Sequence, residues 1–271
     1  MKIFIVGLGL MGSSYALGLS KYHEIYGYDI NKDVTKKALK DKIIISNNLE
    51  LLKTSDLIIL ALYPQDNYQF VKDNLNLFNN QILTDLSGTK EELVHDLEEI
   101  LPKTVSYTSH HPMAGKEKKG YDYKNIEMFK EANFLIVPTK LTKDKDLKIL
   151  SEIANNLNFK RISIVSIEEH DKLIAFTSQL THFLAVCLVN SDRYLHTVEA
   201  TGDSYRDLTR IAKINEVLWT ELFLENKDKL LDEINNLLLE INYLKKNLEE
   251  ENIKNIKNYL IKSRIKREKF D

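Results

Sequence analysis

The chain has 271 residues, enough to bury the core of one large domain or of two moderate ones, and we expect two. Lysine and arginine number 38 against 40 aspartates and glutamates, so the net charge of −2 provides no general attraction to nucleic acid or to an anionic membrane. The composition therefore favours a small-molecule partner, with no nucleic acid and no membrane.

The N-terminal segment superficially resembles a signal peptide, because Lys2 precedes an uncharged stretch that reaches Ser20. The glycines of that stretch, however, have the spacing of a dinucleotide-binding fold, and no convincing small-residue cleavage site precedes Lys21. No other segment approaches the ~20 apolar residues that a bilayer-spanning helix needs. We therefore expect a cytoplasmic protein.

Short apolar runs alternate with amphipathic segments through residues 1–165, a pattern typical of parallel strands joined by crossover helices. The clearest helices are expected at residues 90–101 and 143–158. These features predict an α/β fold with a Rossmann-type, doubly wound, mostly parallel sheet as the NAD-binding domain. The expected strands, most of them rich in β-branched or aromatic residues, are 2–6, 25–28, 57–62, 82–85, 105–109, 134–137 and 161–165.

From residue 166 onward, apolar residues recur at helical spacing with scarcely any strand signal, which predicts an all-helical domain over residues 166–271. The only cysteine, Cys187, lies in an apolar run of the segment 167–190, where we expect core packing. The stretch 237–261, with its basic tail, is predicted to be a solvated terminal helix. The apolar faces of this domain exceed its own needs, which indicates a homodimer formed through it.

A glycine motif directly follows the first expected strand and opens a helix, where glycines let the backbone approach a pyrophosphate. Alone, this motif could be a structural turn. About 20 residues later, Asp29 ends the second strand, where a carboxylate accepts hydrogen bonds from ribose hydroxyls and repels a 2′-phosphate. We therefore predict NAD rather than NADP, although Lys32 lies close by. The expected cofactor residues are Gly7, Gly9, Leu10, Met11, Gly12 and Asp29.

Oxidation of an alcohol requires a group that takes the hydroxyl proton, and a neutral histidine suits this near pH 7. Of the seven histidines, His111 is the first candidate, because its segment follows a strand of the cofactor domain. His182 lies on an otherwise apolar helix face and is either a core histidine or a site residue. The scatter of histidines has no zinc spacing, so we predict no metal. The other five, expected in capping, packing or surface roles, are His23, His95, His110, His170 and His196.

Two arginines of the second domain, Arg206 and Arg210, lie four residues apart and share a face if their segment is helical. A guanidinium matches the planar fork of a carboxylate, but it can also pair with Asp203 or Asp207 of the same domain. We expect Arg210 to bind an anionic substrate and Arg206 to pair internally.

Three segments together resemble the prephenate dehydrogenase family, in the same order along nearly the whole chain. They are the glycine motif at 7–12, His-Pro-Met-Ala-Gly at 111–115 and Arg-Asp-Leu-Thr-Arg-Ile-Ala at 206–212. Members of this family oxidatively decarboxylate prephenate, or its amino counterpart arogenate, on the route to tyrosine, using NAD or NADP and a helical dimerisation domain. The resemblance implies the same activity here.

The resemblance also implies roles for individual residues. His111 would accept a hydrogen bond from the ring 4-hydroxyl, Arg210 would bind a substrate carboxylate, and His182 would line the substrate pocket. As catalytic residues we therefore predict these three. Glu117, Asp207 and Trp219 match family positions around the site, as supporting or gating groups, and we add Ser87 to the expected substrate-binding residues as a substitute hydroxyl.

The sequence departs from the family at several points. Many relatives carry a serine where this chain has Gly88, which leaves Ser87 or Thr89 as the substitute hydroxyl. Relatives often have His-Leu-Pro-His where this chain has Gln-Leu-Thr-His at 179–182. Glu117 would pair with the ammonium of arogenate if it faces that end of the substrate, or with an arginine if it does not.

Two other interpretations compete. One is another two-domain reductase with a helical second domain, such as a β-hydroxyacid dehydrogenase or a pyrroline-carboxylate reductase, which lacks the paired motifs at 111–115 and 206–210. The other is a non-catalytic NAD-responsive binding protein, because a dinucleotide fold does not by itself imply turnover. We expect a single-function enzyme with no fused mutase or regulatory domain.

Overall fold

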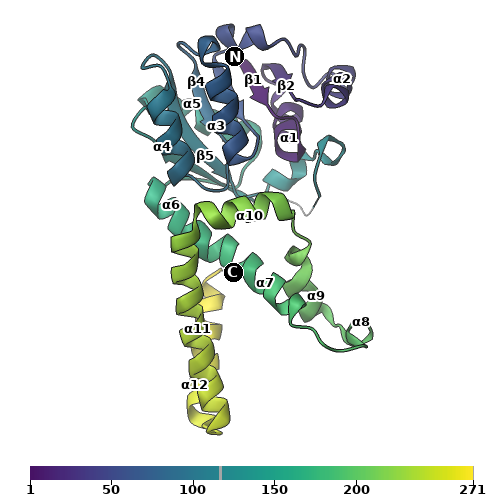
Figure 1. Cartoon of the computed structure of the whole chain (residues 1–271), viewed down its shortest axis with the longest axis vertical. Coiled ribbons are helices and arrows are strands. Elements are labelled where there is room, and N and C mark those ends of the chain that lie inside the picture. The colour runs from purple at the N-terminus through teal and green to yellow at the C-terminus, as the bar shows by residue number, and fades with distance from the viewer. Residues whose placement is uncertain (116–117, 271) are drawn as a thin grey trace.

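The computed structural model describes residues 1–115 and 118–270. A sheet covered by helices forms the upper part of the molecule in Figure 1, and helices alone form the lower part. The seven strands lie in the order β2-β1-β3-β4-β5-β6-β7, and neighbours run parallel except for the antiparallel pair β5 and β6. The predicted α/β architecture is confirmed. The strands are β1 Lys2–Val6, β2 Glu24–Tyr28, β3 Leu57–Leu60, β4 Ile82–Asp85, β5 Ser106–Pro112, β6 Asn133–Pro138 and β7 Arg161–Ile164.

Helices cover both faces of the sheet because the strand residues alternate between two hydrophobic clusters. Ile3 and Ile5 of β1 belong to the cluster that α1 (Leu10–Leu19) and α5 (Asp144–Asn156) complete. Phe4 and Val6 belong to the other cluster, with α3 (Pro64–Asp73) and α4 (Glu91–Ile100). These four side chains of β1 are fully buried, whereas Lys2 at its start is exposed. The remaining helix of this part, α2, spans Lys32–Lys40.

The topology places a crevice at the carboxyl end of β1. The chain passes from β1 to β2 on one side and then to β3 on the other side, so the loops after β1 and β3 diverge. Ligands of open α/β sheets bind at such a switch point. The loop after β1 holds the glycine motif, which is therefore correctly placed for a dinucleotide.

Two strand predictions need correction. β3 ends at Leu60, two residues earlier than expected. β5 begins at Ser106 and continues to Pro112, so His111 lies within a strand instead of following it. The cause is the antiparallel partner β6, which pairs with β5 from Thr108 to Pro112 and extends it beyond its parallel pairing with β4.

The lower part contains helices in an open arrangement, with α11 and α12 forming a long hairpin and α8 and α9 forming an arm on the other side (Figure 1). The prediction of one terminal helix over 237–261 is wrong, because the chain turns at Glu251, whose φ is 51°, and Asn252 caps the next helix. The helices are α6 Ile167–Ile174, α7 Leu180–Asn190, α8 Thr197–Ala200, α9 Asp203–Thr209, α10 Glu216–Glu225, α11 Lys227–Glu249 and α12 Ile253–Arg267.

The helices α6 and α7 are joined by a π-helical turn at Ala175–Gln179. By length and composition alone, the stretch Ile167–Asn190, with a mean hydropathy of 1.5, could cross a membrane, contrary to our expectation. Only 28% of the tested window is buried inside the structure, where the stretch packs against α9 and α11. Cys187 is exposed in the single chain, so the prediction of core packing is wrong there.

Candidate active site

A cleft of about 690 Å³ lies between the carboxyl end of the sheet and the helical part. The glycine turn after β1 and the loops after β3 and β4 form one wall, and α7, α10 and the 3-10 turn Arg210–Ala212 form the other. Tyr63, at the start of α3, and Asn215, at the start of α10, join the two walls by a hydrogen bond of 2.7 Å. Of the predicted residues, the cleft brings together Gly9, Leu10, Met11, Ser87, His111, His182, Arg210 and Trp219.

The glycine turn has the backbone that a dinucleotide site requires. Gly7 has a φ of +89°, in the region that favours glycine, and a Cβ on Gly12 would lie 1.9 Å from the Gly7 carbonyl oxygen. A Cβ on Gly9 would meet no atom of the described residues within 4 Å, so the space above this glycine is open. Gly9 caps α1 without a side chain, which leaves the first amides of Leu10 and Met11 for a pyrophosphate.

Asp29 lies at the end of β2 beside this turn. Its carboxylate accepts hydrogen bonds from the backbone amides of Leu8, at 2.9 Å, and Asn31, at 2.8 Å. These bonds hold the carboxylate at the turn, where its remaining lone pairs can accept ribose hydroxyls. The glycines and Asp29 therefore fit an NAD molecule, whereas a 2′-phosphate would meet the negative charge of Asp29.

His111 is half-buried and lines the cleft from β5. Burial is the largest cause that holds its pKa well below the ordinary value, and the positive charge of Lys90 lowers this pKa further. His111 is therefore neutral near pH 7, as a proton acceptor must be. Its neighbour His110 is fully buried, with a pKa lowered to about 3 by burial, and it hydrogen-bonds Tyr15 and Thr84 in a packing role.

His182 and Trp219 form one wall of the cleft by ring stacking, with centroids 3.8 Å apart and an interplanar angle of 29°. The Nδ1 atom of His182 lies 2.9 Å from the carbonyl oxygen of Ser178, so Nδ1 carries the proton that is donated to this acceptor. The Nε2 atom is then left as an acceptor. Desolvation lowers the pKa of His182 and favours this neutral form.

The two arginines differ in position. Arg210 begins the 3-10 turn after α9 and lines the cleft. Arg206 pairs with Asp203 at 2.7 Å on the exposed side of α9, as predicted. Asp207 is also exposed on α9 and is not among the described residues that line the cleft. Glu117 lies outside the described residues.

The loop after β4 separates the two hydroxyls that could replace the serine of relatives. Ser87 lines the cleft, and its hydroxyl oxygen accepts a hydrogen bond of 3.0 Å from the side-chain amide of Asn67. The hydroxyl proton of Ser87 can therefore be donated to another group. Thr89 instead donates to Glu225 of α10. Gly88 makes room for Leu222, whose Cδ2 would lie 3.1 Å from a Cβ at that position. Ser87 is therefore the hydroxyl that the loop presents to the cleft.

Sequence reasoning missed the residues behind His111. His170, expected in a minor role, lies with its Nε2 atom 2.9 Å from Nδ1 of His111, and Asp171 lies 2.6 Å from the other nitrogen of His170. Because the two histidines lie 59 positions apart in the chain, no local pattern links them. The adjacent His-Asp pair at 170–171 was the only local signal.

A dinucleotide-binding sheet that shares one cleft with a helical domain and a neutral histidine defines a two-domain nicotinamide-dependent dehydrogenase. Comparison with known proteins narrows this class. Residues 15–163 match the nucleotide-binding domain of prephenate dehydrogenase, and residues 166–262 match the dimerization domain of prephenate dehydrogenase. The chain belongs to the prephenate dehydrogenase family.

Individual relatives agree with this assignment. The prephenate dehydrogenase of Lactococcus lactis is 33% identical over 249 residues, which are 87% of this chain and 68% of the relative. That of Bacillus subtilis is 27% identical over 270 residues, which are 95% of this chain and 72% of the relative. The crystal structure of the Aquifex aeolicus prephenate dehydrogenase with hydroxyphenyl propionate and NAD+ covers 100% of this chain and 98% of its own, with a TM-score of 0.90 and 30% identity.

The reductases considered as an alternative share the fold at lower similarity. The pyrroline carboxylate reductase of Plasmodium falciparum has 16% identity and a TM-score of 0.53, covering 97% of both chains. This likeness concerns the fold alone.

Proposed function

We propose that this chain is a cytoplasmic, NAD-dependent prephenate dehydrogenase that oxidatively decarboxylates prephenate to 4-hydroxyphenylpyruvate in tyrosine biosynthesis. The observation that carries the proposal is the cleft that His111 and Arg210 share with the glycine turn after β1. Residues 1–165 would serve as the NAD-binding domain and residues 166–271 as the substrate and dimerisation domain. The proposed partner is a small-molecule substrate, and we propose no nucleic-acid or membrane partner.

The cofactor would lie along the glycine turn, with its pyrophosphate at the amides of Leu10 and Met11 and its adenine-side ribose at Asp29. Gly7, Gly9 and Gly12 would admit it by their missing side chains. NAD bound in this way supplies the acceptor for the hydride that leaves C4 of the substrate ring.

His111 would accept the proton of the ring 4-hydroxyl and later return it. It takes this proton at Nε2 as C4 is oxidised, and the ring carboxylate then leaves as carbon dioxide. The electron pair released from the broken carbon–carbon bond aromatises the ring, and the ring oxygen takes the proton back from His111. The histidine begins and ends the cycle neutral, which its lowered pKa favours.

Other residues would bind and orient the substrate. Arg210 would pair with the side-chain carboxylate through its planar fork. His182 and Trp219 would line the pocket with their stacked rings, and Ser87 would donate to the 4-hydroxyl oxygen. Asp207, which is exposed on α9, and Glu117 match family positions and would act as supporting or gating groups.

The charge of the cleft favours prephenate over arogenate. Among the described lining residues, Lys118, Lys119, Arg210 and Lys213 are positive, and Glu216 is the acidic one. Prephenate brings two carboxylates, whereas arogenate also carries an ammonium that these cations repel. This reasoning opposes the weak preference for arogenate that Glu117 alone suggests.

The test is formation of NADH by the purified protein with NAD and either substrate. We expect turnover with prephenate and a kcat/KM for prephenate at least about tenfold above that for arogenate, equivalent to ~1.4 kcal/mol of transition-state stabilisation. Equal values would contradict the charge argument. No NADH with either substrate would favour another reductase or a silent NAD-binding protein.

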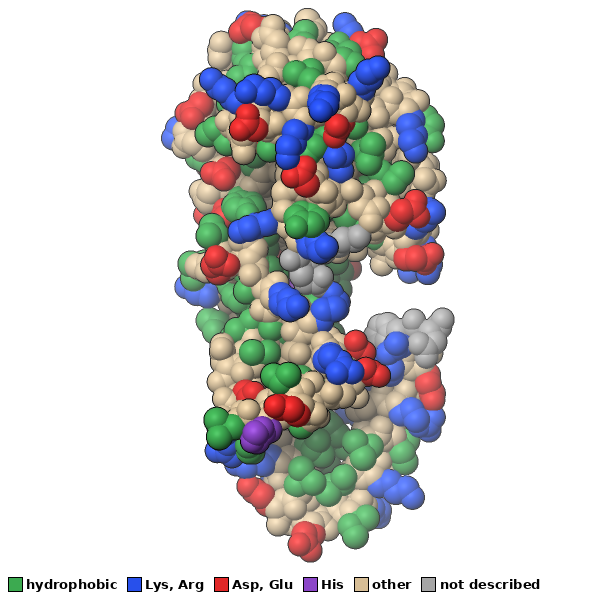
Figure 2. Space-filling model, turned by 90° about the vertical axis from the view of Figure 1, so that its right-hand side faces the viewer, with side chains coloured by type: hydrophobic (Ala, Val, Ile, Leu, Met, Phe, Trp, Pro, Cys, Tyr) green, Lys and Arg blue, Asp and Glu red, His purple; other side chains and the backbone are tan. Residues whose placement is uncertain are grey.

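The helical part would also form a homodimer. In addition to the match of residues 166–262 to a dimerization domain, large apolar side chains are exposed on these helices in the single chain. Figure 2 shows hydrophobic side chains gathered in a hollow of this lower part. A second copy would cover them, because contiguous apolar surface of this kind is rare on monomers.

A further inference from the structure

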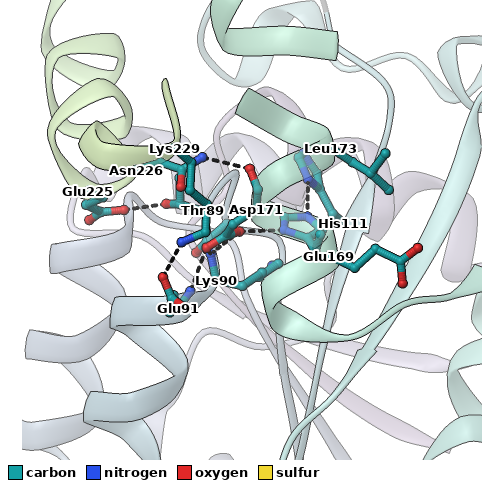
Figure 3. A network of polar contacts seen from close by, with 12 residues as sticks. Thr89, Lys90, Glu91, His111, Glu169, Asp171, Leu173, Glu225, Asn226 and Lys229 are labelled. Atoms are coloured by element: carbon teal, nitrogen blue, oxygen red, sulfur yellow. Dashed lines mark hydrogen bonds and ion pairs between the residues drawn. The ribbon is translucent and has the colours of Figure 1, made fainter. Parts of the chain in front are cut away.

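A chain of hydrogen bonds runs from the cleft into the boundary between the two parts of the molecule. Nδ1 of His111 lies 2.9 Å from Nε2 of His170, and Nδ1 of His170 lies 2.6 Å from Oδ1 of Asp171. The side chains of His170 and Asp171 are 0% and 2% exposed, so water does not compete for these bonds. Figure 3 shows His111 at one end of this network and Asp171 near its middle.

The carboxylate of Asp171 is held by the start of α4, which belongs to the sheet part. It accepts hydrogen bonds from the backbone amides of Lys90, at 3.0 Å, and Glu91, at 2.9 Å. Lys90 is the N-cap of α4 and does not cap the helix with its own side chain. Asp171, from α6, thus satisfies helix amides that would otherwise be unpaired and sits where the helix dipole favours a negative charge.

Asp171 is also held through its backbone carbonyl oxygen, and a buried ion pair lies near it. The side-chain amide of Asn226, a residue that is 2% exposed, donates to the backbone carbonyl oxygen of Asp171 at 2.9 Å and to the side-chain oxygen of Gln179 at 2.8 Å. The other charges that act on His170 are Lys90 and Asp85, a fully buried ion pair at 2.8 Å. His170 therefore faces one carboxylate directly, and His111 reaches that carboxylate only through His170.

The bonding capacities of these groups determine where the protons lie. A carboxylate only accepts, so Nδ1 of His170 carries a proton. Burial lowers the pKa of His170 and keeps the ring neutral, so its Nε2 atom is an acceptor. Nδ1 of His111 must then donate to that Nε2 atom, because two acceptors cannot bond. In neutral His111 this leaves Nε2 without a proton, which is the form required to accept one.

We infer that His170 and Asp171 are positioning residues for the proposed reaction, which lock His111 in the tautomer whose Nε2 atom accepts the substrate proton. When His111 takes that proton, its Nδ1–H bond to His170 strengthens and the Asp171 carboxylate stabilises the added charge. Because Asp171 also caps α4, the base is held in place only when the sheet and helical parts are docked together. This inference rests on the proposed function.

The decisive variant is Asp171→Asn. Its remaining oxygen can still accept from the α4 amides, but its NH₂ group faces Nδ1 of His170 and must donate to it. His170 then carries its proton on Nε2, and His111 is forced to carry its proton on the atom that should accept. We expect kcat to fall by roughly 100-fold to 10,000-fold, with little change in the Kd for NAD.

The control is Asp228→Asn, the same change on the exposed first turn of α11, where the side chain is 92% exposed. It should leave kcat and the thermal unfolding midpoint unchanged. A folded Asp171→Asn protein whose kcat stays within about twofold of the wild type would overturn the inference.

A second measurement needs neither a variant nor turnover. Nitrogen NMR of the imidazoles in the wild-type protein should show Nδ1 protonated and Nε2 unprotonated in both His111 and His170. A proton on Nε2 of His111 would overturn the inference. Because this readout is independent of the substrate, it separates failure of the positioning role from failure of the proposed function.

Discussion

The imidazole of His111 lies where the parallel pairing of β5 with β4 has ended and β5 pairs with β6 alone. The residue is half-buried, so protein atoms cover part of the ring. Burial disfavours the charged ring, and the positive charge of Lys90 disfavours it further, so the pKa of His111 is well below the ordinary value. A lowered pKa means that His111 stays unprotonated, and able to accept a proton, at a lower pH than an ordinary histidine. As pH falls through about 6.5, where a free histidine would protonate, His111 remains neutral.

Replacement of His111 should therefore affect chemistry more than binding. We expect His111→Asn to lower kcat by roughly 100-fold to 10,000-fold while the Kd for NAD stays near the wild-type value, because the asparagine fits the site but takes up no proton. Stopped-flow NADH formation and NAD titration measure the two quantities. His95→Asn, on the exposed side of α4, is the matched control.

The pH profile gives a check on the same residue. In the wild type, kcat/KM should remain level as pH falls through about 6.5 and should decline only at lower pH, where His111 becomes protonated. A decline centred near 6.5 would indicate an ordinary, unperturbed base. Near-normal turnover of His111→Asn would remove this residue from the mechanism.

At the scale of elements, the loop after β4 and the helix α10 are matched in shape. Gly88 leaves a space that Leu222, only 8% exposed, fills from the other part of the molecule. A Cβ atom added to Gly88 would lie 3.1 Å from Cδ2 of Leu222, so the two side chains would have to move apart. In a tightly packed boundary such a movement lowers the free energy of unfolding. Leu222 thus occupies the space that the missing side chain at Gly88 leaves.

This pairing predicts a non-additive effect. Gly88→Ser should lower the free energy of unfolding by ~1 kcal/mol, because the serine presses against Leu222. In a Leu222→Ala background the same serine should cost nothing further, since the space is then free. Urea unfolding of the four proteins measures both steps. An equal cost of the serine in the two backgrounds would contradict the contact.

At the scale of the whole molecule, the long hairpin of α11 and α12 leaves apolar side chains in solvent when the chain is alone. Leu231 and Leu238, seven residues apart and hence on one face of α11, are 48% and 47% exposed. The exposed Cys187 of α7 belongs to the same helical part. This exposed apolar surface supports the proposed homodimer.

We expect the wild-type protein to elute as a dimer, and the double variant Leu231→Glu, Leu238→Glu to elute as a monomer or a concentration-dependent mixture, because buried unpaired charges oppose association. Light scattering after size exclusion measures the mass. Ile45→Glu, at a 59% exposed position of the sheet part, is the control and should remain dimeric. A dimeric double variant would place the interface elsewhere.

Several features followed from the sequence, because local patterns carried them. The glycine turn, Asp29 and the alternating strand residues depend on neighbours a few positions away, so the sheet and the cofactor were predictable. The residue pattern already favoured Arg210 as an anion binder, and the family resemblance added that His182 lines the substrate pocket. The extension of β5 was not predictable, since it depends on pairing with β6, more than twenty positions away.

What the sequence by itself determined is the class of fold, the dinucleotide turn and the candidate base, all of which depend on short-range geometry. Only the tertiary structure decided that Ser87 and not Thr89 reaches the cleft, and that His170 and Asp171 stand behind His111. The physical reason is that hydrogen-bond partners and buried charges are set by the docking of α6 and α10 on the sheet, which no local pattern encodes.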